Sequence, residues 1–171
     1  ITGLSVEELQ KVNLSFRPVT NQIYVPKVVI DRETGNYTAT LEQNVTHEVS
    51  ALNVNDYSLD VTEYTGTTSE TREMAFTKKP VYDITLNFVG LSEEEAAAST
   101  TTFTNLKEAG YSYSFVGTQN IALRDGTYSV KVNSPKYQKL TSNLVVSGAT
   151  VEKTVEFEQP TVWDFSNPEF T

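Results

Sequence analysis

The side chains able to do acid–base or nucleophilic chemistry are few in this chain. His47 is the only histidine, and there is no cysteine. A catalytic triad or a metal cluster would need His47 beside suitable partners, and its neighbours Thr46 and Glu48 are a poor set. The lack of cysteine excludes disulfides, thiolate zinc sites and cysteine nucleophiles. We therefore expect His47 to be a surface residue on a loop, with no catalytic role.

Carboxylates occur in groups, and a glycosidase needs a pair of them. Glu93–Glu95 stand together, but they open a predicted helix, where the helix dipole stabilises negative charge. Glu152, Glu156 and Glu158 lie on one face of the last predicted strand, as solvent-exposed side chains do. The sequence therefore indicates no catalytic residues and a protein that is not an enzyme.

Calcium requires several oxygen atoms that converge on one point. Asn53, Asn55 and Asp56 form one group of such ligands, and Asp31 with Glu33 forms another. Neither group follows the loop pattern of a calcium site, and turns closed by Asn or Asp side chains explain both. We predict no metal site and no cofactor.

Aromatic rings could bind carbohydrate, because they stack on the faces of sugar rings. The chain has 9 tyrosines, 8 phenylalanines and one tryptophan. Four of these aromatic residues alternate toward a predicted core: Tyr111, Tyr113, Phe115 and Tyr128. Three others fall in predicted turns or in the tail and are the candidate ligand-binding residues: Tyr64, Tyr137 and Trp163.

The net charge and the hydropathy of the chain limit the kinds of partner that it can bind. The net charge is −9 and is spread evenly along the chain, so the acidity indicates solubility rather than a steering patch. Nucleic acid is an unsuitable partner for such a surface. No apolar run approaches the ~18 residues that cross a membrane. The first residue is not Met, and no signal peptide is present, so we expect a piece of a longer chain. The lack of cysteine favours a secreted or cell-surface protein of a Gram-positive bacterium.

The sequence contains internal repeats. Gly3-Leu4-Ser5 recurs 87 residues later as Gly90-Leu91-Ser92, and Phe16 recurs at the same offset as Phe103. A second match has an offset of 71 and relates Ala51–Val61 to Ala122–Val132. Such self-similarity predicts tandem copies of one folding unit. By the second match, Tyr57 and Tyr128 should occupy equivalent inner strands.

The elements that position these residues are mostly strands. In Val81–Val89 the residues Tyr82, Ile84, Leu86 and Phe88 form the predicted core face. Ser92 and Glu95 form a capping box for a short helix over 93–99. Further strands are predicted at 100–106, 111–116, 120–123, 127–133, 139–147 and 151–158, and the register of the last is left open.

We therefore predict an all-β chain of two tandem Ig-like Greek-key β-sandwiches, with a short helix in the first inter-strand connection of each. Repeat 1 covers residues 1–80, repeat 2 covers 81–160, and a tail at 161–171 opens a following module. Because Ile1–Leu4 aligns with Phe88–Leu91, repeat 1 lacks most of its first strand.

Residues 122–158 carry a family resemblance. Gly126-Thr127-Tyr128, Lys136-Tyr137 and Ser147-Gly148 resemble the strand and turn motifs of transthyretin-like modules, typified by carboxypeptidase regulatory-like and Cna-B-type repeats. The resemblance implies a β-sandwich, without a specific activity. The Lys–Asn crosslink of Cna-B repeats is not expected, because 81–89 contains no Lys. Residues 163–166 resemble the start of modules that follow such repeats in secreted polysaccharide-degrading proteins of gut bacteria.

Two functions remain open. The first is a non-catalytic accessory or spacer region of a secreted polysaccharide-processing or cell-surface protein, with carbohydrate binding as one role and neighbouring modules as partners. The second is an interaction module of adhesin or filament type, in which one chain adds a strand to another. The missing first strand and the strand-like tail motivate the second.

Overall fold

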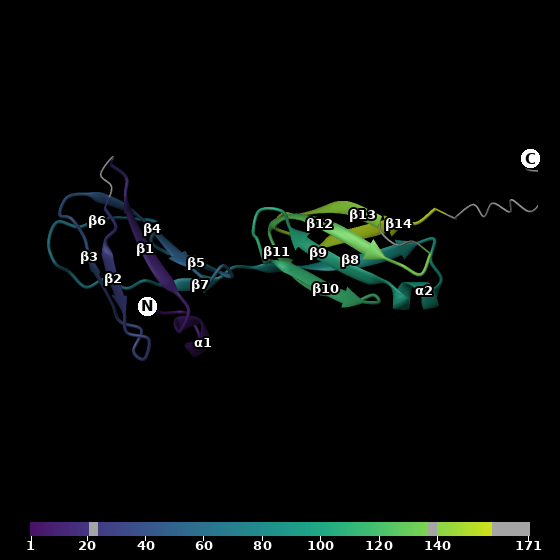
Figure 1. Cartoon of the computed structure of the whole chain (residues 1–171), viewed down its shortest axis with the longest axis horizontal. Coiled ribbons are helices and arrows are strands. Elements are labelled where there is room, and N and C mark those ends of the chain that lie inside the picture. The colour runs from purple at the N-terminus through teal and green to yellow at the C-terminus, as the bar shows by residue number, and fades with distance from the viewer. Residues whose placement is uncertain (21–23, 137–139, 159–171) are drawn as a thin grey trace, which may run out of the picture. The chain divides into compact units, whose positions relative to one another are not determined.

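A computed structural model describes residues 1–20, 24–136 and 140–158. The chain is mostly β-structure, as predicted, with two short helices in the described part. It divides into two compact units, Ile1–Lys79 (unit 1) and Pro80–Thr171 (unit 2). Figure 1 shows their elements. No helix of the described residues is long and apolar enough to cross a membrane.

Unit 1 is built from one short helix and seven strands within its described residues. In chain order these are α1 (Val6–Leu9), β1 (Asn13–Pro18), β2 (Lys27–Ile30), β3 (Tyr37–Thr40), β4 (Thr46–Leu52), β5 (Tyr57–Leu59), β6 (Glu63–Thr65) and β7 (Phe76–Lys78). The strands pair in three groups, β1-β4-β6, β2-β3 and β5-β7, all antiparallel. Thr2 forms a parallel bridge with Ala75.

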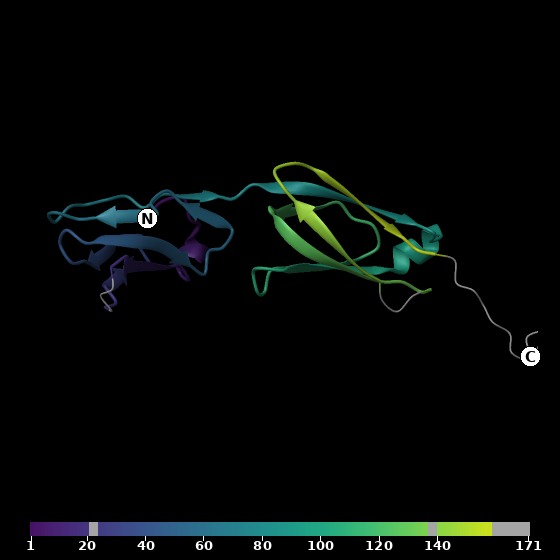
Figure 2. The ribbon, with the colours of Figure 1, turned by 90° about the horizontal axis from the view of Figure 1, so that it is seen from above.

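Unit 2 has one helix and seven strands among its described residues. They are β8 (Val81–Val89), α2 (Glu93–Ala98), β9 (Thr100–Asn105), β10 (Ser112–Val116), β11 (Ile121–Arg124), β12 (Gly126–Asn133), β13 (Leu140–Val146) and β14 (Val151–Glu156). One sheet has the order β10-β9-β12-β13 and the other β11-β8-β14. Figure 2 shows these sheets as two layers, which gives unit 2 a β-sandwich-like character.

The alternation of apolar residues decides which face of each strand is buried. In β8, Ile84 and Leu86 are fully buried, and Tyr82 and Phe88 pack against the same cluster, as the sequence predicts. The register of the last strand, which the sequence left open, is set by Val155 and Phe157, both buried. Unit 1 has a hydrophobic cluster of its own, centred on Phe16, Val49, Met74 and Phe76.

The 87-residue repeat describes one structural motif that occurs in both units. Ser5 and Ser92 each cap a helix through the reciprocal bonds of a capping box. Gly3 and Gly90 precede them with φ values of +86° and +91°. At either glycine an added Cβ would overlap a backbone carbonyl oxygen, that of Phe76 in unit 1 and of Phe157 in unit 2. Phe76 and Phe157 are therefore equivalent positions.

The 71-residue match does not describe a structural repeat, and the predicted equivalence of Tyr57 and Tyr128 is wrong. Tyr57 lies in β5, which pairs with β7. Tyr128 lies in β12, which pairs with β9 and β13. If Phe16 is aligned with Phe103, then Pro18 aligns with Asn105. His47 lies opposite Pro18 in its sheet, and Tyr128 lies opposite Asn105 in its own. The residue of unit 1 that is equivalent to Tyr128 is therefore His47. A shared run of strand-forming residues reports strand propensity, which does not fix the partner of a strand.

Candidate functional site

Of the three aromatic residues predicted to bind ligand, the structure describes one. Tyr64 is a half-buried residue of β6, and so it lies in a strand rather than in the predicted turn. Tyr137 and Trp163 lie outside the described residues. The surroundings of Tyr64 are therefore the place where a candidate site can be built from the described residues.

Tyr64 lies in a groove between two segments of unit 1, which we call the β3 groove. Residues 37–43, which comprise β3 and the turn after it, form one wall, and residues 66–74 form the other. The groove holds a cavity of about 270 Å³ and a more open one of about 770 Å³. Its apolar lining includes Phe16, Ala39, Leu41, Tyr64 and Met74.

One backbone hydrogen bond and one side-chain hydrogen bond join the two walls at one end of the groove. The amide of Asn44 donates to the carbonyl of Gly66 at 2.8 Å, and Gln43 Nε2 donates to the carbonyl of Thr67. At the other end, the amino group of Ile1 donates to the carbonyl of Gly35 at 2.9 Å, and Thr2 N donates to Met74 O at 2.9 Å. The walls between these ends form a slot.

Two polar side chains of the 66–74 wall lie at Tyr64. Its hydroxyl donates a hydrogen bond to Glu70, and this bond raises the pKa of the phenol. The guanidinium carbon of Arg72 lies 5.6 Å from the centroid of the Tyr64 ring. Across the groove, the Tyr37 hydroxyl donates to the carbonyl of Arg72 at 2.9 Å. The slot thus combines an apolar floor with the Glu70 carboxylate and the Arg72 guanidinium at its rim.

The backbone of β3 has an edge without a strand partner. Asp31 N donates to Asn36 O at 2.8 Å, which marks these residues as a hydrogen-bonded pair of the β2–β3 ladder. Such pairs alternate in an antiparallel ladder, so Thr38 and Thr40 bond toward β2 while Tyr37 and Ala39 point their N–H and C=O groups the other way. Among the described residues neither has a backbone partner there. These groups face the β3 groove.

His47 is not the surface loop residue that the sequence suggested. It is fully buried in β4, because β4 begins at Thr46 and its alternation turns His47 inward with Val49. The Nε2 atom lies 2.5 Å from the hydroxyl of Tyr24. The Nδ1 atom has no hydrogen-bond partner among the described residues.

The acidic groups have structural partners. Glu95 accepts from Ser92 N at 2.8 Å, which lowers its pKa and completes the cap of α2. Asp31 accepts from Glu33 N and Thr34 N in a tight turn. The described residues contain no group of three His, Cys, Asp or Glu side chains placed to hold a metal ion.

Sequence reasoning did not identify Tyr37, Glu70, Arg72 or the open edge of β3. A signal for them existed: the alignment of Ile1–Leu4 with Phe88–Leu91 implied that a strand of repeat 1 was missing. The groove lies between β3 and residues 66–74, which are not paired with each other as strands among the described residues.

Comparison with known proteins gives no match. No family model matches the chain, and no curated protein and no solved structure is significantly similar to it.

Proposed function

We propose that this chain is a non-catalytic accessory region of a secreted or cell-surface multimodular protein, and that unit 1 is its interaction module. The ligand is an extended polypeptide segment that enters the β3 groove and adds to β3. The backbone edge of Tyr37 and Ala39, which pairs with no strand among the described residues, is the observation that supports this function most directly. Strand addition uses such an edge for affinity and side-chain pockets for selectivity.

A substitution on the edge itself tests the proposal. Ala39→Pro removes one N–H that points into the groove and leaves the β2–β3 ladder intact, because proline is tolerated on an edge whose N–H faces solvent. Ala39→Val keeps the N–H and is the matched control. The probe is a fluorescent peptide with the sequence of residues 81–87. We expect Ala39→Val to bind it and Ala39→Pro to lose most of the affinity, as measured by fluorescence anisotropy. Equal binding by both variants would contradict strand addition at β3.

Carbohydrate binding at the same groove is the second candidate. The Tyr64 ring, the hydroxyls of Thr38 and Thr67 and the Glu70 carboxylate are groups that bind sugars in proteins. Screening against plant polysaccharides tests it, with Tyr64→Ala as the test variant and Tyr113→Ala as the control outside the groove. A glycan that binds the wild type and the control, but not Tyr64→Ala, would favour this candidate.

A further inference from the structure

Strand β1 lies at the edge of its sheet, and its outer side has no strand partner among the described residues. It pairs with β4 alone, and Val19 N donates to Thr46 O at 3.0 Å just beyond the ladder. Bonded pairs alternate in an antiparallel ladder, so Leu14 and Phe16 point their N–H and C=O groups away from β4. No described backbone group bonds to these two residues on that side.

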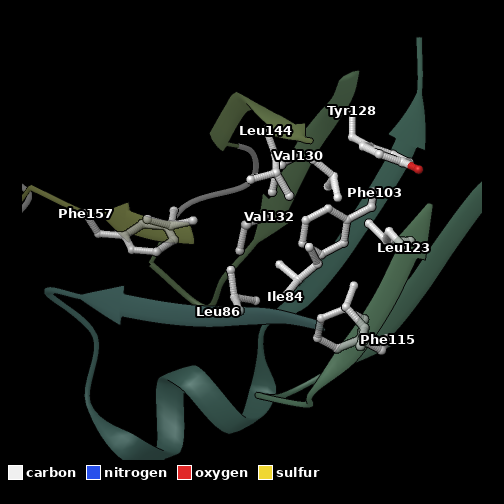
Figure 3. Close-up of a cluster of buried hydrophobic side chains, with 13 residues drawn as sticks. Ile84, Leu86, Phe103, Phe115, Leu123, Tyr128, Val130, Val132, Leu144 and Phe157 are labelled. Atoms are coloured by element: carbon white, nitrogen blue, oxygen red, sulfur yellow. The ribbon is translucent and has the colours of Figure 1, made fainter. Parts of the chain in front are cut away.

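The corresponding edge of unit 2 is occupied. β9 follows α2 as β1 follows α1, and Phe103 is the counterpart of Phe16. β10 pairs with this edge of β9, with Tyr113 opposite Phe103 and Phe115 opposite Thr101. Figure 3 shows Phe115 beside Phe103 in the core, and the two rings stack with a centroid distance of 6.2 Å. A strand that added to β1 in the same way would send a large side chain into unit 1 beside Phe16.

Strand β2 does not take this place in unit 1, and a cavity of about 340 Å³ lies between β1 and β2. Because Asp31 N bonds to Asn36 O, Val28 and Ile30 point their backbone groups away from β3. The cavity has room for an aromatic side chain, since one of about 150 Å³ accommodates a benzene ring. Its lining comes from both strands and includes Leu14, Phe16, Val28 and Ile30.

The surroundings of this cavity are basic in an otherwise acidic chain. Residues 9–30 contain no Asp or Glu, although the net charge of the chain is −9. Arg32 lies at the amino end of β1, where Nη1 donates to Val12 O at 2.8 Å and Nη2 to Asn13 Oδ1 at 2.9 Å. Arg17, near the other end, pairs with Glu48 and keeps 75% of its side chain exposed. These charges favour an occupant that carries carboxylates.

We infer that the outer edge of β1 binds an extended acidic peptide that runs antiparallel to β1, in the register that β10 has beside β9. This site goes beyond the proposed function, because the β3 groove does not contain the β1 edge. The peptide residues opposite Leu14 and Phe16 are apolar and face the cavity, since directly opposed residues lie on the same face of a sheet. A carboxylate lies opposite Arg17, and the carboxyl end of the peptide lies near Arg32.

The probe is a peptide with the sequence of residues 111–116 that carries Ser112→Glu, because this position stands opposite Arg17. Fluorescence anisotropy with the full 171-residue chain measures its binding. N-methylation at the position of Tyr113 removes the N–H that bonds to Phe16 and should weaken binding about tenfold or more. N-methylation at the position of Ser114, whose N–H points away from β1, should change affinity less than about threefold. Equal affinities of these two peptides would overturn the pairing.

Charge complementarity is tested by reversing charges. Arg17→Glu should weaken binding of the probe at least about threefold, and Ser112→Lys in the peptide should restore affinity for that variant. Arg72→Glu, in the β3 groove, is the matched control and should leave binding unchanged. Ala39→Pro should also leave it unchanged, so the two sites can fail separately. Equal losses for Arg17→Glu and Arg72→Glu would overturn the assignment to β1.

Direction is tested by a nitroxide label on either end of the peptide. A label on the amino end should broaden the amide NMR signals of Arg17 and Val19 most strongly, and a label on the carboxyl end those of Asn13 and Leu14. The reverse result would overturn the antiparallel direction.

Two further results would overturn the choice of occupant. A dimer of the unliganded chain that dissociates as the peptide binds would assign the β1 edge to a second copy. Displacement of the peptide by polygalacturonate, an anionic polysaccharide, would assign the basic surroundings to a glycan. We expect a monomer by sedimentation and no displacement.

Discussion

At the scale of single residues, Tyr128 shows how a buried phenol ties one strand to the turn before it. Its hydroxyl donates to the carbonyl of Arg124 at 2.6 Å, and its ring packs edge-on against Tyr111 at 5.7 Å. Burial raises the pKa of this phenol. Tyr128 occupies the core of unit 2, while the matching position in unit 1 is held by His47.

Replacing Tyr128 by Phe should destabilise unit 2 by about 1 kcal/mol, because it removes the buried hydrogen bond from the Tyr128 hydroxyl to the carbonyl of Arg124. Tyr113→Phe is the control. The prediction that Tyr113 faces the core is wrong, because in β10 only Phe115 is buried and Tyr113 is 45% exposed, so its substitution should change stability by less than about 0.5 kcal/mol. Urea denaturation followed by circular dichroism measures both. Similar effects for the two variants would show that the hydroxyl of Tyr128 has no structural role.

The hydrogen bond between Tyr64 and Glu70 makes the stability of unit 1 depend on pH. The hydrogen bond to Glu70 raises the pKa of Tyr64 above its usual value near 10. Because the neutral phenol is the form that bonds, this contribution to folding is present below the unfolded pKa and is lost as pH rises through the folded one.

Glu70→Gln removes the negative charge and should bring the pKa of Tyr64 back toward its usual value. Absorbance at alkaline pH, compared between the variant and wild type, measures the shift. A Tyr64→Phe difference spectrum assigns the signal, and an unchanged titration in Glu70→Gln would show that the two side chains do not interact.

At the scale of elements, the turn at Gly90 joins β8 to α2, and the turn at Gly3 joins the Thr2 bridge to α1. The strand ends where the chain must pass close to Phe76 O or Phe157 O, and the capping box starts the helix. Only glycine adopts this φ beside a carbonyl without strain. The motif recurs because both units need the same close passage.

Gly3→Ala and Gly90→Ala should each destabilise their own unit by at least about 2 kcal/mol. Since each unit has its own hydrophobic cluster, differential scanning calorimetry should show two transitions, with a different one lowered in each variant. Gly148→Ala is the control, because its added Cβ meets no atom within 4 Å, and it should cost about 1 kcal/mol of strain. A single transition lowered equally by both variants would contradict independent cores.

Strand positions were predictable in unit 2 and less so in unit 1, for a physical reason. β8 matches its predicted range residue for residue, because nine alternating positions report one buried face. Strand pairing was not predictable in the same way. The match between Ala51–Val61 and Ala122–Val132 gave a wrong equivalence of strands, because it compares local strand propensities and not strand partners. The burial of His47 was missed because a lone polar residue carries no periodic signal. Tyr64 was found from its ring alone, but its groove depends on hydrogen bonds between residues that are 22 to 35 positions apart in the sequence.

At the scale of the whole molecule, each unit brings its first segment beside its last. In unit 2, β8 and β14 run parallel through six registered pairs, from Ile84 and Val151 to Val89 and Glu156. In unit 1 the same arrangement is reduced to the bridge between Thr2 and Ala75 and the bonds beside it. The two units therefore share a parallel closing pair of segments.

This parallel pair sets how each unit would respond to tension along the polypeptide. Pulling on the start of β8 and the end of β14 slides the two strands lengthwise, so the hydrogen bonds between them bear the load together instead of opening one after another. Unit 2 would therefore hold as a rigid link under shear.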